Sequence, residues 1–215
     1  MTGALQAVPR GDREWSPAGH QHASNVIARI MPMFKGLSRR QAYRLALRLI
    51  EEANGRYHRD PGTRPLGCRS HDCFSCCLFQ KRIDCTAFDV GRILDQAERE
   101  GRLREVVSRA SKLIEGGKGG ACPLLSREGR CTVYKHRPLA CAAMHSMDRE
   151  ACKDEFGMSP HAELLWIETH VIAGFGMFPV DELMSGKRGD PPDLFAMLAE
   201  LGGKRLGDDE EGQAA

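Results

Sequence analysis

The sequence has few aromatic residues and almost no net charge. Aromatic residues make up 6% of the chain, and the formal net charge is +2. No basic segment interleaved with aromatic side chains is present, so the stacking surface typical of proteins that bind single-stranded nucleic acid is missing. A charge so close to balance also gives no long-range attraction for a polyanion. We therefore predict that nucleic acid is not the partner.

The sequence also lacks long hydrophobic runs. No uninterrupted stretch of roughly 18 apolar residues occurs, so no membrane-spanning helix is predicted. The first residues do not show a basic start followed by an apolar segment, which is the pattern of a secretory signal. We predict a cytoplasmic protein without membrane association. In that reducing compartment, grouped cysteines are more often metal ligands or redox groups than disulfides.

Cysteine is the residue type that the sequence contains in an unusual pattern. All nine cysteines lie between positions 68 and 152. Thiols gathered in this way indicate a metal site or a disulfide framework, and the expected compartment favours metal. Apart from Cys85, the cysteines form two groups: Cys68, Cys73, Cys76 and Cys77, and then Cys122, Cys131, Cys141 and Cys152.

The first group contains a short-spaced pair. Cys73-x-x-Cys76 can place two thiolates on one metal ion. Cys77 follows directly, and neighbouring side chains in an extended segment point in opposite directions. Cys76 and Cys77 are therefore expected to serve different metals, or one metal and one structural role. Cys68 can join this group as a third ligand, and His71 is a weaker candidate in the same loop.

The second group has no short-spaced pair and must converge by folding. Structural zinc sites usually draw on two such pairs, whereas iron–sulfur clusters accept more varied spacing because each iron needs only one protein thiolate. We therefore favour an iron–sulfur cluster, with 4Fe–4S as the first choice and zinc as the alternative. Eight thiolates suffice for two four-ligand sites, or for one cluster and a zinc. Basic residues beside the cysteines can offset the charge of the thiolates: Arg69, Arg130, Lys135 and Arg137.

Apolar residues that recur with the helical period predict a mainly helical chain. Ser38 and Gln41 match the capping box that starts a helix. The segments on either side of residues 126–129 resemble the two arms of a short β-hairpin. The expected helices cover residues 24–31 before Pro32, 39–54, 87–97, 102–115, 160–173 and 190–201 before Gly202.

These elements predict an α+β fold. We expect a mainly helical single domain with a small β-hairpin, organised around a cysteine-ligated metal site. Residues 1–21 are expected to form a disordered N-terminal arm, and residues 205–215 an acidic disordered tail. Residues 22–204 are then the single domain, with its metal-binding core at about 66–160.

Four segments together resemble a known bacterial family. They are Cys73-Phe-Ser-Cys76-Cys77, Cys122-Pro-Leu-Leu, Cys131-Thr-Val-Tyr-Lys-His-Arg-Pro-Leu-Ala-Cys141 and Cys152-Lys-Asp-Glu-Phe-Gly157. Over roughly residues 66–160 the chain resembles the YkgJ-like cysteine-cluster family, also described as the CxxCxxCC zinc- or iron-chelating domain. Two features depart from the family pattern. Four residues rather than two separate Cys68 from Cys73, and Ala142 stands where the family often has arginine.

The resemblance implies a metal-binding protein but does not choose between zinc and iron. It leaves Cys85 as a small buried apolar residue. The eight cysteines that it implies as metal ligands are Cys68, Cys73, Cys76, Cys77, Cys122, Cys131, Cys141 and Cys152.

Three functions are compatible with this pattern. The first is an iron–sulfur protein with a redox, electron-transfer or sensing role toward an unknown protein or redox partner. The second is a structural zinc protein that acts as an interaction module. The third is an enzyme with Cys141 as nucleophile and His145 as base, but no residue that would orient the base is identifiable. We favour the first.

Overall fold

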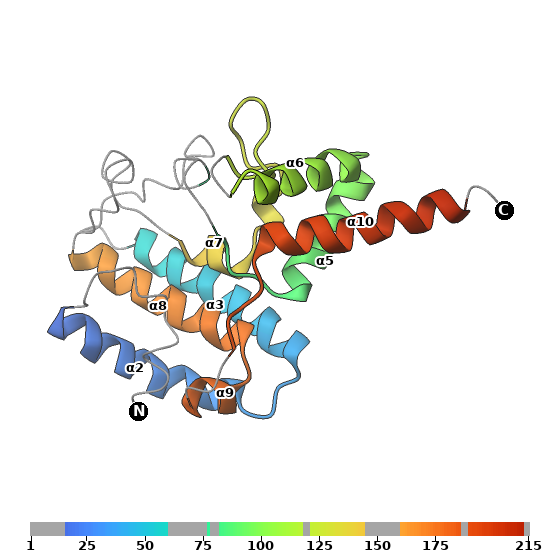
Figure 1. The fold of residues 1–215 in the computed structure, drawn as a ribbon. Helices are drawn as coiled ribbons and strands as arrows, with labels where there is room; N and C mark the ends of the chain where they lie inside the picture. The colour runs from blue at the N-terminus through green and yellow to red at the C-terminus, as the bar shows by residue number, and fades with distance from the viewer. Residues whose placement is uncertain are drawn as a thin grey trace. The chain divides into compact units, whose positions relative to one another are not determined.

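The computed structural model describes residues 16–59, 77, 82–117, 121–144, 160–185 and 189–212. The chain divides into two compact units, each built from two separate stretches of sequence. The first unit comprises Met1–Arg69 and Leu139–Asp190, and the second comprises Ser70–Pro138 and Pro191–Ala215. Because their relative placement is not determined, each unit is described by itself (Figure 1).

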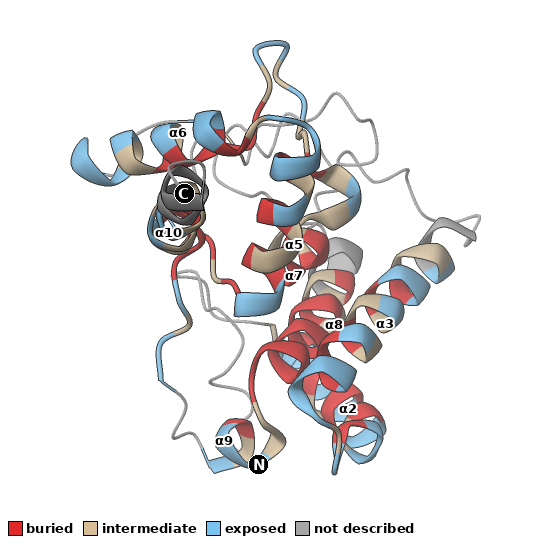
Figure 2. Ribbon diagram, turned by 90° about the vertical axis from the view of Figure 1, so that its right-hand side faces the viewer, coloured by how far each residue is buried: buried red, intermediate tan, exposed pale blue. Residues whose placement is uncertain are grey.

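The first unit is a group of helices around a central apolar helix, α8. The helices are α2 (Pro17–Phe34), α3 (Arg39–Arg59), α7 (Leu139–Ala143), α8 (Pro160–Met177) and α9 (Val180–Ser185). A helix that is apolar on nearly all sides must be covered on all sides. Helices α2, α3, α7 and α9 all pack against α8, and most of α8 is buried (Figure 2).

Helix α8 approaches its neighbours very closely at Gly176. A Cβ atom at this position would lie 2.5 Å from Cβ of Ala46 on α3 and 2.9 Å from Cδ1 of Leu139 on α7. The Leu139 side chain could shift, but Cβ of Ala46 is fixed to its backbone, so a side chain at position 176 would push α3 and α8 apart. The absence of a side chain at Gly176 therefore sets how tightly α3, α7 and α8 pack.

Helix α2 begins earlier and ends later than the sequence predicts. Ser16 caps it, because its Oγ accepts a hydrogen bond of 3.0 Å from the Gly19 N–H. The helix therefore includes Pro17 and part of the stretch expected as an arm. It also continues through Pro32 to Phe34. Phe34 is only 2% exposed, and its burial in the core offsets the hydrogen bond that the proline removes.

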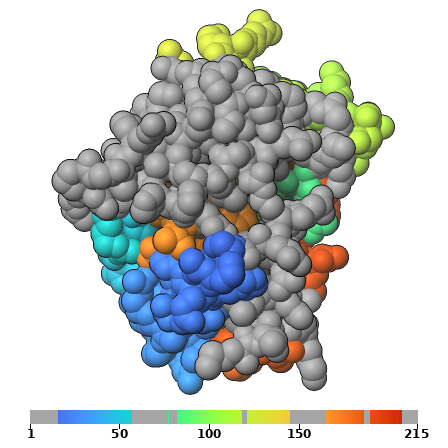
Figure 3. Space-filling view, turned by 90° about the vertical axis from the view of Figure 1, so that its left-hand side faces the viewer, coloured from blue at the N-terminus to red at the C-terminus, as the bar shows by residue number. Residues whose placement is uncertain are grey.

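Helix α3 starts as predicted. Gln41 N–H donates to Ser38 Oγ at 3.4 Å, and Ser38 N–H donates to Gln41 Oε1 at 2.9 Å, so both halves of the capping box form. The helix continues past residues 54–55, where we expected it to end, to Arg59. In the space-filling view, α2 and α3 form part of the surface of this unit (Figure 3).

The second unit contains helices α5 (Ala87–Arg99), α6 (Leu103–Glu115) and α10 (Leu194–Gly212), with the 3-10 turn η2 (Tyr134–His136). Thr86 and Asp89 form a capping box at the start of α5. Helix α10 packs against both α5 and α6. The buried residues along these helices are Val90, Ile93, Leu94, Ala97, Leu103, Val106, Val107, Ala110, Leu194, Phe195 and Leu198.

Gly202 does not end the last helix, contrary to the sequence prediction. A Cβ atom at Gly202 would lie 2.3 Å from Cγ2 of Val107 on α6 and 3.2 Å from Cδ2 of Leu94 on α5. This glycine is therefore the point where α10 crosses its neighbours. The helix continues to Gly212 through Gly203, where a Cβ atom would meet no other atom within 4 Å.

The predicted β-hairpin is wrong, and with it the α+β class. Within the described ranges there is no strand, only isolated antiparallel bridges between Asp84 and Asp193 and between Leu125 and Cys131. The turn itself forms, since Ser126 N–H donates to the Arg130 carbonyl at 2.8 Å. Pairing stops on one side because Pro123 has no N–H, and on the other because the chain enters η2. The described fold is helical.

His170 is a buried histidine in α8. Its Nδ1 lies 2.8 Å from the Trp166 carbonyl oxygen, and the two ring centroids are 4.0 Å apart. A carbonyl only accepts hydrogen bonds, so Nδ1 carries the proton in this contact. Burial lowers the pKa of His170 from 6.5 to about 4, against a smaller opposing effect of the bond to Trp166. The ring is therefore neutral at pH 7 in the folded protein.

The substitutions Gly202→Ala and Gly203→Ala should have opposite effects on stability. Alanine at position 203 meets no atom and lowers the backbone entropy of the unfolded chain, so the free energy of unfolding should rise by about 0.5–1 kcal/mol. Alanine at position 202 overlaps Val107 and should lower it by about 1–3 kcal/mol. Urea unfolding followed by circular dichroism measures both. Equal effects at the two positions would contradict the close crossing of α10.

The stability of the protein should fall between pH 7 and pH 5 because of His170. In this range the unfolded state takes up a proton at this residue and the folded state does not, so acidification favours unfolding. His170→Asn keeps a donor for the Trp166 carbonyl but has no titration. Between pH 7 and pH 5 the native protein should lose about 2 kcal/mol more free energy of unfolding than the variant. Identical losses in urea titrations at the two pH values would refute the assignment.

Candidate metal centre

Half of the eight predicted ligands fall within the described residues. Cys77, Cys122 and Cys131 belong to the second unit, and Cys141 belongs to the first. The other predicted ligands lie outside the described residues: Cys68, Cys73, Cys76 and Cys152. The weaker ligand candidate His71 also lies outside them, as does His145, the base considered for an enzyme. Three of the candidate ligands are therefore described within one unit, the second.

A main-chain hydrogen bond joins the two cysteine groups. Cys122 N–H donates to the Cys77 carbonyl oxygen at 2.7 Å. Cys122 is 4% exposed, and Cys77 is half-buried. Because the bond uses only backbone atoms, it brings the two residues together without engaging either sulfur. The end of the first cysteine group is thus fixed beside the start of the second.

A tight turn then connects Cys122 to Cys131. Leu125 N–H donates to the Cys122 carbonyl at 3.1 Å, and Leu125 pairs with Cys131 in the antiparallel bridge. Thr132 adds two bonds to the Leu124 carbonyl, from its N–H at 3.0 Å and from its hydroxyl at 2.8 Å. Gly129 closes the turn with a φ of 75°, a left-handed conformation that favours glycine. Cys131 is half-buried in this arrangement.

Arg109 on α6 holds this turn from the side. Its guanidinium donates to the Leu125 carbonyl, and to the Cys122 carbonyl at 3.4 Å. The same guanidinium lies 3.5 Å from Glu105 Oε1, one helical turn earlier. A planar fork with several donors suits two carbonyl oxygens at once. The sequence did not reveal this residue, because nothing in its local pattern distinguishes it from an arginine on a solvated helix face.

The described residues do not by themselves complete a metal site. Within the ranges that the structure describes, no three side chains of histidine, cysteine, aspartate or glutamate gather as a metal-binding group. The structure does place Cys77, Cys122 and Cys131 on one hydrogen-bonded main-chain framework. A metal centre that uses these cysteines would take its further ligands from outside the described ranges.

Positive charge follows Cys131 along the chain. The Arg137 guanidinium lies over the Tyr134 ring, 4.5 Å from its centroid, in a cation–π contact. Arg92 Nη2 is 3.1 Å from His136 Nδ1. Desolvation, and then the charges of Arg92 and other nearby basic residues, lower the pKa of His136. The positive charge of this segment would stabilise a nearby anion. A thiolate-ligated metal centre would be such an anion.

Cys141 lies on α7, which the first unit anchors firmly. Leu139 and Ala143 are both fully buried, and the Thr169 hydroxyl on α8 is 2.8 Å from the Ala143 carbonyl oxygen. Cys141 itself is half-buried. Helix packing thus holds the backbone of this residue in place.

Cys85 is set apart from the other cysteines by its environment. It is 1% exposed, and its Sγ lies 3.5 Å from the Pro192 carbonyl and 3.6 Å from Met197 Sδ. Burial, reinforced by the nearby carboxylates of Asp89 and Asp193, raises the pKa of the Cys85 thiol far above its ordinary value. The thiol stays protonated, and no disulfide engages it. These properties match the expectation of a small buried apolar residue rather than a metal ligand.

Comparison with known proteins supports the family resemblance. Residues 67–162 match the family model described as "CxxCxxCC: Putative zinc- or iron-chelating domain". The match confirms the family suspected from the sequence, over less than half of the chain. No curated protein and no solved structure matches this chain. The matched segment contains all eight predicted ligands, and Cys85 as well.

Among the described helices, none combines the length and the apolar character needed to cross a bilayer.

Arg109→Met should weaken metal binding. It removes the donors from two carbonyls of the Cys122–Leu125 turn, and loss of residues that orient a ligand typically lowers metal affinity by about 10–100-fold. The free energy of unfolding should fall by about 1–3 kcal/mol. Competition with a chromophoric chelator measures the affinity. Lys112→Met on the same helix removes an exposed charge outside the turn and is the matched control. Equal affinities in both variants would exclude the role of Arg109.

Proposed function

We propose that the protein holds an iron–sulfur cluster, 4Fe–4S as the first choice, through cysteines of the segment 67–162, and that this cluster serves a redox, electron-transfer or sensing role. The zinc- or iron-chelating character of the matched family is the starting point. The choice of iron–sulfur and the role are our proposal. The cluster would supply one-electron transfer to or from a partner.

The observation that carries the proposal is the hydrogen bond between Cys122 N–H and the Cys77 carbonyl. It ties the first cysteine group to the second, which a centre with ligands from both groups requires. The sequence provides only one C-x-x-C pair, at Cys73 and Cys76, whereas structural zinc sites usually use two. Clusters take ligands at more varied spacing.

Charge around the site is compatible with a bound anionic centre. Four thiolates on a doubly charged metal core leave a net charge of about −2. The residues after Cys131 include Lys135, Arg137 and the Arg92–His136 pair on the same unit. The positive potential of these residues would stabilise thiolates. The environment of Cys85, by contrast, disfavours a thiolate.

Structural zinc is the second candidate. The description of the matched family names zinc as well as iron, and a tight turn with main-chain bonds between Cys122 and Cys131 also suits a small ion that needs fixed ligands. A zinc site would stabilise an interaction module and transfer no electrons. The two candidates differ in colour, in sulfide content and in the metal itself.

Anaerobic purification followed by elemental analysis, sulfide determination and a visible spectrum tests the proposal. An iron–sulfur protein should be brown, with iron and acid-labile sulfide in similar amounts. Colourless protein with stoichiometric zinc and no sulfide would overturn the cluster and favour the zinc module, which should unfold on chelation.

Serine substitutions should separate ligands from the buried thiol. Cys76→Ser, Cys122→Ser and Cys131→Ser should each lose metal and solubility, because a hydroxyl does not replace a thiolate ligand. Cys85→Ser should keep its metal, since that thiol is protonated and buried in a hydrogen-bonded site. Metal analysis of the four variants gives the result. Equal metal content in all of them would contradict the ligand assignment.

A further inference from the structure

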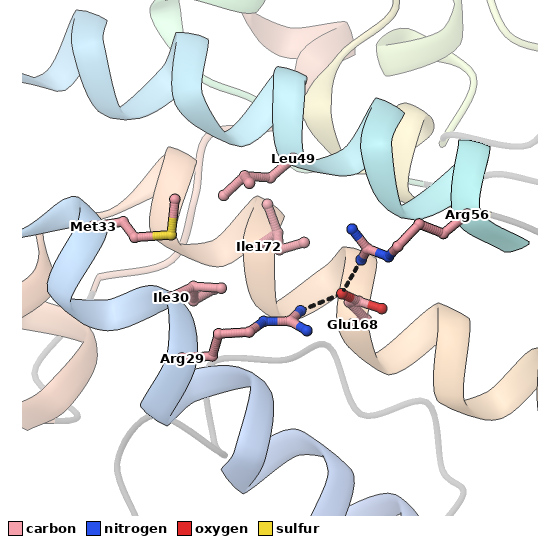
Figure 4. A pocket seen from close by; sticks show the side chains of 7 residues that line it. All are labelled: Arg29, Ile30, Met33, Leu49, Arg56, Glu168 and Ile172. Atoms are coloured by element: carbon pink, nitrogen blue, oxygen red, sulfur yellow. Dashed lines mark hydrogen bonds and ion pairs between the residues drawn. The ribbon is translucent and has the colours of Figure 1, made fainter.

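The first unit contains a small cavity between three of its helices. Its volume is about 210 Å³, and its walls come from α2, α3 and α8 (Figure 4). This is smaller than the roughly 300–1,000 Å³ typical of sites for drug-sized ligands, so only a small molecule would fit. The two ends of the cavity differ in chemistry, one being charged and the other apolar.

The polar end consists of Arg29, Arg56 and Glu168. Both guanidiniums reach the same carboxylate oxygen, Glu168 Oε1, and the Arg56 contact is 2.6 Å. The Glu168 side chain is only 13% exposed, whereas those of Arg29 and Arg56 are 58% and 50% exposed. Two cations and one anion leave this end with one surplus positive charge.

The two arginines also retain unused donors. A guanidinium carries five N–H donors, and each of these arginines makes one hydrogen bond to Glu168 and no other within the described residues. The remaining N–H groups are therefore available to an incoming acceptor. Carboxylates bind guanidinium groups through two parallel hydrogen bonds, which makes them the best-matched monoanion.

The other end of the cavity is apolar. Ile30 and Ile172 are each 1% exposed and form its closely packed base, so the apolar surface open to a ligand comes from the half-buried Leu49 and from Met33. Met33 lies at the end away from the arginines (Figure 4) and is 43% exposed, which is unusual for a large apolar side chain in this protein. Figure 4 shows the order along the cavity: the charged groups, then the isoleucines and leucine, then methionine.

We propose that this cavity binds a small apolar monocarboxylate. The ligand's carboxylate would bridge Arg29 and Arg56, and its hydrocarbon part would lie against Leu49 toward Met33. One surplus positive charge matches one carboxylate, and burial of the apolar part against the cavity wall adds favourable energy. This site does not depend on the proposed metal centre.

Hexanoate, hexanol and hexylamine distinguish this proposal from simple hydrophobic binding. Isothermal titration calorimetry on the whole chain should show hexanoate binding at least roughly tenfold more tightly than hexanol, because charge-assisted hydrogen bonds contribute to the carboxylate alone. Hexylamine, which is a cation at neutral pH, should not bind. Equal affinities for hexanoate and hexanol, or no binding of hexanoate, would overturn the proposal.

Substitutions at the polar end test the assignment residue by residue. Arg29→Gln and Arg56→Gln should each weaken hexanoate binding about tenfold or more and leave hexanol binding unchanged. Glu168→Gln should strengthen hexanoate binding, since it removes the competing carboxylate; a purely structural role of the three residues predicts the opposite. Arg44→Gln on the exposed face of α3 is the control with the same change of charge. Arginine variants that behave like this control would refute the site.

Chain length tests the apolar end. Native protein should bind hexanoate more tightly than propanoate, and Met33→Glu should abolish that difference by placing a charge where the end of the hydrocarbon chain lies. A chain-length preference that survives this substitution would contradict the orientation proposed. All variants of this cavity should keep the native metal content, so failure of this proposal is distinguishable from failure of the metal assignment.

Discussion

The bond from Cys122 N–H to the Cys77 carbonyl is the constraint on which the candidate metal centre depends. It connects two cysteine groups that a long stretch of helical sequence separates. The bond that brings them together runs between main-chain atoms. Arg109 holds the carbonyl of Cys122 from α6, and α6 in turn packs against α10. The Arg109 guanidinium therefore links helix packing in the second unit to the turn between Cys122 and Cys131.

Two cysteines of this unit show how environment separates residues of one type. Cys85 lies next to carboxylates and the Pro192 carbonyl, in surroundings that oppose a thiolate. Cys131, by contrast, leads into a segment that carries a cation–π pair and an arginine–histidine contact. Desolvation and nearby charge act in the same direction at Cys85. Proximity in sequence to other cysteines thus does not decide which thiol can serve as a ligand.

Short-range signals predicted much of the fold, whereas long-range features escaped them. The predicted capping box at Ser38–Gln41 forms because both partners lie within one turn of the chain. Pro32 and Gly202 were expected as helix ends, but burial of Phe34 and the crossing of α10 over Val107 outweigh the local preference. The hairpin failed because one proline and a 3-10 turn limit its pairing to a single bridge.

The candidate sites also differ in whether a local sequence pattern predicts them. The family of the cysteine segment was recognised because its residues lie at fixed spacing. Arg109, and the meeting of Arg29 and Arg56 at Glu168, depend on segments that are distant in sequence, so no local pattern reveals them.

The division of the chain has a consequence for how the protein forms in the cell. Each unit needs two separate stretches of the sequence: the second stretch of the first unit contains α8, and that of the second unit contains α10. During synthesis, the first core cannot close before α8 has left the ribosome, nor the second before α10 has done so. The cysteines of the newly made chain therefore remain exposed while translation continues. During this period, metal ions or oxidants can react with their thiols before the cores have formed.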